Sequence, residues 1–179
     1  MSSRFNPYPV RREPDGSYSF RTENKITYGV VFSEQGDLFS TYTHLSHLFF
    51  DFTIDVVDLG GNKFPPKDFR TGDTIGWTAG QFLASTPDAA LTYTCDDLDK
   101  KAHKRSLQFT RWFDQFNQGL EKHDYMIPIV VEEADEWGNT HRVNKVQYTS
   151  LMLSVSNSQR QALLDAFNEG VKDYQSYKS

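Results

Sequence analysis

The sequence predicts a single α+β domain with a predominantly antiparallel sheet, and three observations lead to this prediction. The chain has 179 residues, of which 37% are hydrophobic and 24% charged, a balance typical of one globular domain. Apolar residues alternate with period two in some segments, as in half-buried strands, and recur every three or four residues in others, as in helices. Most strand-like segments follow one another through short turns, which favours antiparallel pairing.

The first third of the chain predicts an arm followed by three strands. Residues 1–16 are rich in proline and end in Pro-Asp-Gly, so we expect an N-terminal arm and a turn before a domain at 17–175. Alternating apolar residues at 18–22 and 26–32 predict a hairpin, and a third strand is expected at 47–59.

The remaining elements give the order β-β-β-α-β-α-β-β-α. We expect helices near 71–85, 97–119 and 157–174, a short strand at 90–95, and a strand pair at 125–133 and 141–155 around a turn at 137–139. Asp96 is the predicted cap of the second helix, and Ser156 with Gln159 a capping box for the third. Aromatic residues of the second helix share one face, which predicts core: Phe109, Trp112, Phe113 and Phe116.

Two groups of residues are candidate ligand-binding sites. Small residues spaced by four in the first helix predict tight packing on the sheet, or alternatively an open helix N-terminus that binds an anion. The donors of that anion site would be Arg70 and the backbone amides of Gly72, Asp73 and Thr74.

The second group lies between the short strand and the second helix and contains Cys95, Asp96, Asp99 and His103. This set mixes soft and hard ligands without a recognised spacing, so we expect no metal there. Neighbouring carboxylates should raise the pKa of the Cys95 thiol, which favours a structural cysteine over a nucleophile.

The same region resembles a family of small bacterial proteins that carry a domain of unknown function. The similarity is in a Y-x-C-D…R…F-x-x-W-F segment, formed here by Tyr93, Cys95, Asp96, Asp99, Arg105, Phe109, Trp112 and Phe113. It implies a compact bacterial intracellular domain and implies no catalytic residues.

The order of elements is similar to the core of the acyl-CoA N-acyltransferase superfamily. That similarity implies a cofactor pyrophosphate at the N-terminus of the first helix and a pantetheine arm between two parted strands, with Asp51, Asp55 or His103 as acid or base. The segment RTGDTIG departs from the glycine signature of that superfamily, and Asp73 places a negative charge near the expected phosphates.

Net charge, apolar runs and the cysteine count disfavour several classes of function. The formal net charge of −5 disfavours nucleic acid unless basic residues gather on one face. The N-terminus lacks an apolar signal region, no apolar run is long enough for a membrane span, and a single cysteine allows no internal disulfide, so we expect a cytoplasmic protein.

Two function hypotheses follow, and whether the protein is an enzyme stays open between them. The leading one is a non-catalytic binding or regulatory module without a cofactor, which interacts with a protein partner or a second copy. The alternative is an acyl-CoA-dependent N-acyltransferase-like enzyme, or a degenerate remnant of one. A flat apolar patch would favour the interaction module, and a deep basic cleft would count against it.

Overall fold

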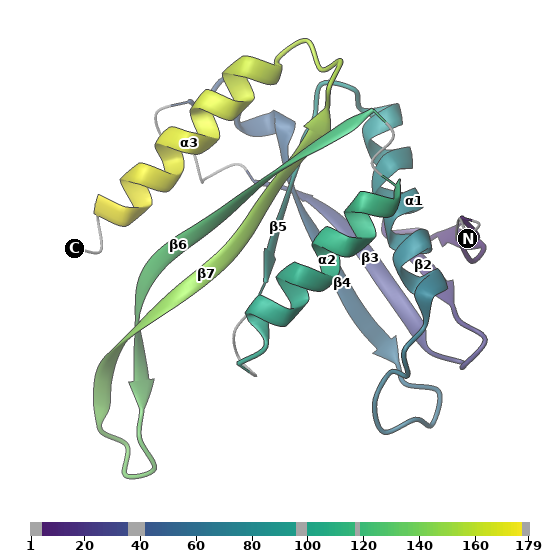
Figure 1. Cartoon of the computed structure of the whole chain (residues 1–179), viewed down its shortest axis with the longest axis horizontal. Coiled ribbons are helices and arrows are strands. Elements are labelled where there is room, and N and C mark those ends of the chain that lie inside the picture. The colour runs from purple at the N-terminus through teal and green to yellow at the C-terminus, as the bar shows by residue number, and fades with distance from the viewer. Residues whose placement is uncertain (1–4, 36–41, 96–99, 117–118, 177–179) are drawn as a thin grey trace.

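A computed structural model describes residues 5–35, 42–95, 100–116 and 119–176, with side chains to residue 173. Within these residues, seven strands form one sheet in the order β1-β2-β3-β4-β5-β7-β6, with three α-helices packed against it (Figure 1). All neighbouring strands are antiparallel except β4 and β5. The predicted α+β class with a predominantly antiparallel sheet is confirmed.

The first four strands form an antiparallel meander. They are β1 (Val10–Arg12), β2 (Tyr18–Arg21), β3 (Thr27–Glu34) and β4 (Phe49–Asp58), and a short 3₁₀ turn, η1 (Ser46–Leu48), precedes the last of them. The hairpin and the third strand were therefore predicted correctly to within two or three residues.

The N-terminal segment packs on the rest of the domain. Tyr8 is only 6% exposed, and its ring stacks on Phe20 at a centroid distance of 6.3 Å. Residues 10–12, which fall within the predicted arm, add β1 to the edge of the sheet.

Two helices flank the short strand in the middle of the chain. They are α1 (Phe69–Ser85) and α2 (Ala102–Phe116), with β5 (Ala90–Cys95) between them. The expected start of α2 at residue 97 is wrong: Lys100 has a left-handed backbone (φ 59°), which a right-handed helix cannot include, and the helix begins only at Ala102. The proposed cap, Asp96, lies outside the described residues.

The last third of the chain forms a long hairpin and a helix. β6 (Leu120–Ala134) and β7 (Thr140–Ser154) pair along their whole length, but β5 pairs only with residues 148–153 of β7, so the far half of the hairpin extends beyond the sheet (Figure 1). α3 (Arg160–Ser176) follows. The predicted capping box is wrong, because the amide of Gln159 donates to the side chain of Asn157 at 2.8 Å and not to that of Ser156.

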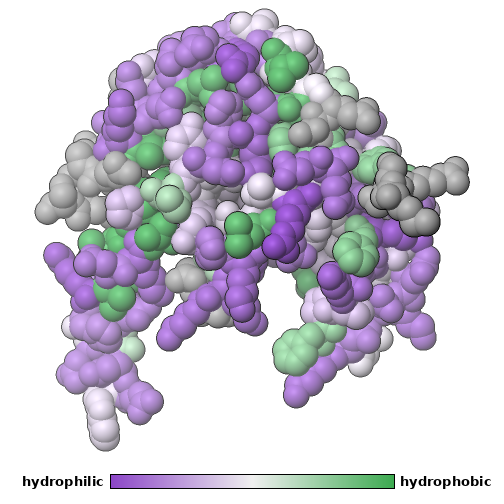
Figure 2. All heavy atoms as spheres, in the orientation of Figure 1, coloured by the Kyte–Doolittle hydropathy of each residue, from purple (hydrophilic) through white to green (hydrophobic). Residues whose placement is uncertain are grey.

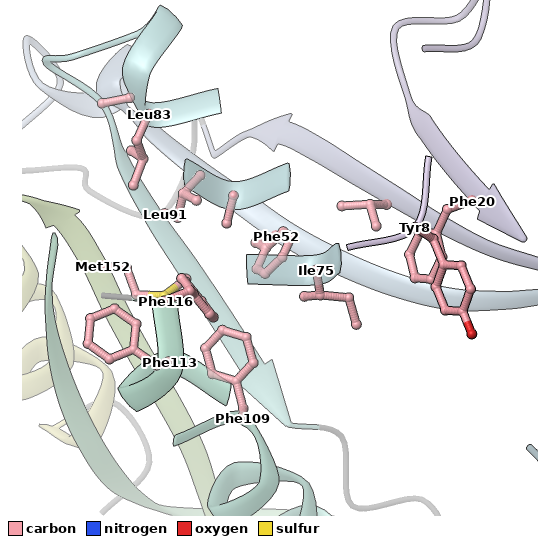
Figure 3. Close-up of a cluster of buried hydrophobic side chains, with 13 residues drawn as sticks. Tyr8, Phe20, Phe52, Ile75, Leu83, Leu91, Phe109, Phe113, Phe116 and Met152 are labelled. Atoms are coloured by element: carbon pink, nitrogen blue, oxygen red, sulfur yellow. The ribbon is translucent and has the colours of Figure 1, made fainter. Parts of the chain in front are cut away.

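The helices cover opposite faces of the sheet and create two cores. α1 and α2 pack on one face, where Phe52, Ile75, Phe109 and Met152 are buried (Figure 3). α3 packs on the other face over β5 and β7, where Leu151 and Leu163 are fully buried. In the described part of the chain, no helix combines the length and the apolar content needed to span a bilayer.

Candidate ligand-binding cleft

The sheet opens at its only parallel strand pair among the described residues. β4 and β5 pair over three positions, from Phe49 opposite Ala90 to Asp51 opposite Thr92. Beyond this point β4 continues to Asp58 paired with β3, while β5 continues to Cys95 paired with β7. The two strands therefore part, and the backbone groups that face the gap have no partner strand between them.

A cleft of about 820 Å³ lies over this gap, a volume typical of small-molecule sites. Its floor includes Tyr28 and Ile54 from the sheet and Thr71 and Ile75 from α1. α2 forms one wall, and the loop between β4 and α1 forms the other. Figure 2 shows a recess at the lower edge of the molecule beside this loop.

Positive charge gathers around the cleft. Among the residues that the structure describes, its lining contains four cationic side chains, Lys67, Lys104, Arg105 and Arg111, and one carboxylate, Asp68. Because the whole chain has a formal charge of −5, this excess of cations is a local segregation of charge. The field in the cleft therefore favours an anionic ligand.

Two tyrosines supply hydroxyl groups to the cleft. Burial raises the pKa of Tyr93, whose ring stacks on Phe109 at 4.2 Å. Burial also raises the pKa of Tyr28, and the Asp68 carboxylate adds to that rise. Both hydroxyls stay protonated at neutral pH, so each can donate a hydrogen bond to a ligand but neither is poised as a base.

The N-terminus of α1 is already capped by a carboxylate. Asp68 accepts a hydrogen bond from the amide of Arg70 at 3.0 Å. The hydroxyl of Tyr8 donates to the same carboxylate at 2.8 Å. The helix dipole at this end is thus satisfied by a residue of the chain itself.

The predicted anion-binding residues at this helix end hold the N-terminal segment. Arg70 pairs with Glu23, donates to the Asn6 carbonyl at 3.0 Å and lies 3.8 Å from the centre of the Tyr8 ring. Asp73 accepts from the amide of Asn6, and Thr74 accepts from the amide of Tyr8. The helix end is therefore covered by the chain, not open as that hypothesis requires.

Two glycines of α1 allow α2 to pack closely against this helix. A Cβ added to Gly72 would lie 2.3 Å from the Trp112 indole, and one added to Gly76 would lie 1.9 Å from the Phe116 ring. Tight packing through small residues was expected, but against the sheet. The structure corrects the partner to α2.

Of the second predicted group, the structure describes Cys95 and His103. Cys95 is buried, and burial is the main reason that its pKa is raised; the carboxylate of Asp124 adds less. His103 is exposed on α2 and its ring lies 5.2 Å from that of Tyr148, outside the cleft lining. Asp96 and Asp99 lie outside the described residues. Among the residues that are described, no three potential metal ligands come together.

The strand carboxylates also lie away from the cleft. Ile54 and Val56 line it, so Asp51 and Asp55, which alternate with them along β4, belong to the opposite face of the sheet. Asp55 is exposed, and Asp51 accepts a hydrogen bond from Thr53 at 3.0 Å. Neither aspartate is placed as an acid or base for a molecule in the cleft.

The cleft itself was missed in the sequence, although α2 carries a signal for it. Lys104, Gln108, Arg111 and Gln115 follow one another at intervals of four, three and four, and all four line the cleft. Such spacing places them on one helix face.

The sequence matches no family model, and comparisons with curated proteins and with solved structures gave no match.

Proposed function

We propose that this protein is a binding module that holds an anionic small molecule in the cleft between α2 and the loop that connects β4 to α1. The observation that carries the proposal is the cleft itself, with a volume of about 820 Å³ and cationic side chains converging on a partly aromatic floor. Pockets of this size with a few convergent polar groups are the usual form of small-molecule sites. A cleft of this kind counts against an interaction module that acts only through a flat surface.

Binding rather than catalysis is the role that the cleft side chains support best. Burial holds Tyr28 and Tyr93 neutral, so neither is poised as a base, and most charged groups of the described lining are cations that attract an anionic ligand. Trp112, which is half-buried, offers an indole surface for a flat or apolar part of the ligand.

A second candidate is an acyl-CoA-dependent N-acyltransferase-like activity, and the parting of β4 from β5 favours it. An extended pantetheine arm needs a gap between two strands, and the parallel pair here ends after Asp51 and Thr92. Against this candidate, the Asp68 carboxylate occupies the end of α1 where backbone amides would have to face a pyrophosphate.

Thermal unfolding with added ligands tests both candidates. A ligand at 100 times its dissociation constant should stabilise the fold by about 2.7 kcal/mol. We expect a rise in melting temperature with organic anions and none with matched neutral compounds. Acetyl-CoA and free coenzyme A belong in the panel, followed by an assay for thiol release from acetyl-CoA with amine acceptors.

The outcomes separate the two candidates. Stabilisation by coenzyme A with acetyl-CoA-dependent thiol release would replace the binding module by the enzyme. Stabilisation by anions without thiol release supports the binding module. If no anion at millimolar concentration shifts the melting temperature, the cleft is not an anion site and the proposal fails.

A further inference from the structure

The two walls of the cleft differ in chemistry. The α2 wall carries Lys104 and Arg111, with Gln108 between them on the same helix face. The facing wall is largely apolar, with Val56 from β4, Pro65 and Pro66 from the loop that follows it, and Phe69, the first residue of α1. The same loop also carries Lys67, whose ammonium group lies 4.8 Å from the centre of the Phe69 ring. The Phe69 side chain is 72% exposed at this wall. A ligand that contacts both walls meets cations on one side and hydrocarbon on the other.

The charges of Lys104 and Arg111 on the α2 wall are not neutralised by neighbouring side chains in the described part of the chain. Lys104 and Arg111 are exposed and form no ion pair or hydrogen bond with any residue that the structure describes. By contrast, the guanidinium of Arg70 is engaged by Glu23 and by the Asn6 carbonyl. Lys104 and Arg111 are seven residues apart, so their Cα atoms lie about 10 Å apart along the helix.

The anionic group of a ligand is directed to α2 and not to α1. Asp68, the one carboxylate among the described residues of the cleft lining, caps α1 and repels a second anion from that helix end. Lys67 lies next to Asp68 in the sequence and over the Phe69 ring, so Lys104 and Arg111 on α2 are the cations best placed for a second anion. The anionic group is therefore assigned to α2, whereas the sequence around Arg70 indicated the backbone amides at the N-terminus of α1.

Resting on the proposed function, we infer that the cleft binds an amphipathic organic anion, with its carboxylate or phosphate against Lys104 and Arg111 and its apolar chain or ring against the β4 and loop wall. Hydrocarbon packed on Val56, Pro66 and Phe69 is removed from water, which favours binding in proportion to the buried area. The α2 cations then select molecules that carry a negative headgroup at one end.

Octyl phosphate, octanol and inorganic phosphate separate the two requirements. Isothermal titration at low ionic strength, with octyl phosphate kept below its micelle concentration, should show binding that weakens as salt is added. Octanol lacks the charge and inorganic phosphate lacks the chain, so each should bind at least tenfold more weakly. Equal binding of inorganic phosphate and octyl phosphate would overturn the amphipathic assignment.

Variants on the two walls locate the contacts. The double variant Lys104→Gln/Arg111→Gln should weaken octyl phosphate binding by roughly tenfold or more, because it removes both charge-assisted contacts to the headgroup. It should leave octanol binding and the melting temperature unchanged, because both side chains are exposed. Lys172→Gln, an exposed lysine on α3, is the matched control and should have no effect.

The results distinguish this inference from the proposed function. If an organic anion binds and Val56→Asp abolishes the binding while Lys104→Gln/Arg111→Gln does not alter it, the ligand is in the cleft but the assignment to α2 is wrong. If no organic anion binds the wild-type protein at all, the proposed function has failed and the inference fails with it.

Discussion

Glycines in α1 illustrate how one residue type has two different roles in one helix. Gly76 lies under the Phe116 ring, so its missing side chain makes room for α2. Gly80 has no atom within 4 Å of the position that a Cβ would take. A glycine inside a helix costs about 1 kcal/mol relative to alanine, and of these two glycines only Gly76 makes a contact that offsets the cost.

The two glycines should therefore respond oppositely to alanine. Gly80→Ala is expected to raise the free energy of unfolding by about 1 kcal/mol. Gly76→Ala should lower it by about 1–3 kcal/mol, because the added methyl group overpacks the contact with Phe116. Chemical denaturation of both variants measures this, and a destabilised Gly80→Ala would mean that the site is not open.

Trp112 contributes to stability through its contact with Gly72. Trp112→Ala should reduce the free energy of unfolding by about 3 kcal/mol, near the lower end for large aromatic residues because the indole is only half-buried. Trp137 is 86% exposed in the β6–β7 turn, so Trp137→Ala is the control and should change stability by less than about 0.5 kcal/mol. If Trp112→Ala unfolds with the same free energy as wild type, the indole lines the cleft without contributing to stability.

At the scale of secondary-structure elements, an ion pair links α3 to β6, the strand at the edge of the sheet. Arg160, the first residue of α3, donates from Nη2 to Glu121 at 2.8 Å, and its Nε lies 2.5 Å from the other carboxylate oxygen. These contacts lower the pKa of Glu121 below its ordinary value of 4.5. His123 lies 3.6 Å from the same carboxylate.

This pair predicts a stability loss in acid. Because the pKa of Glu121 is lower in the folded than in the unfolded protein, its contribution is complete above about pH 5 and is lost as the pH falls through the folded-state pKa. Glu121→Gln should therefore be less stable than wild type at pH 7, and the difference should shrink below pH 4. A difference that is constant from pH 7 to pH 3 would contradict the assignment.

The spacing of apolar residues predicted most helices and strands, because most of them have one apolar face and one polar face. β4 alternates Phe52 and Ile54 with exposed or half-exposed polar residues, and α2 repeats buried phenylalanines at helical spacing. The start of α2 was missed because the left-handed conformation of Lys100 leaves no mark in composition. Likewise, the side chain of Asn157, which accepts from the Gln159 amide just before α3, is held in place by a tertiary contact, its donation to the Ala89 carbonyl at 3.1 Å.

The cleft could not be predicted, because it depends on contacts between distant segments. The order of strands, the parallel pairing of β4 with β5 and its early end are set by packing across the sheet and not by any one segment. The residues first considered, from Arg70 to Thr74, carry ligand-binding chemistry that the N-terminal segment occupies. The stripe from Lys104 to Gln115 was visible in the sequence, but its meaning required the position of the facing wall.

For the molecule as a whole, the N-terminal segment connects the sheet edge, α1 and the cleft rim. Tyr8 packs its ring in the core beside Phe20 and donates its hydroxyl to Asp68, which both caps α1 and lines the cleft. The Tyr8 amide donates to Thr74 at 2.8 Å. Folding of the segment and formation of the cleft are therefore coupled through one side chain.

Removal of this segment should destabilise the whole fold and not only its edge. A chain that begins at residue 10 loses the buried Tyr8 ring, and we expect a loss of about 3 kcal/mol or more, as for other buried aromatic residues. Tyr8→Phe keeps the ring and loses the hydroxyl that donates to Asp68 and accepts from the Glu23 amide, so its cost should be about 1–2 kcal/mol. Far-ultraviolet circular dichroism and the fluorescence of the three tryptophans, one of which is Trp112 in the cleft, should show coincident unfolding transitions in all three proteins. If truncation leaves both transitions at the wild-type midpoint, the segment is an appendage, and the cap on α1 forms without it.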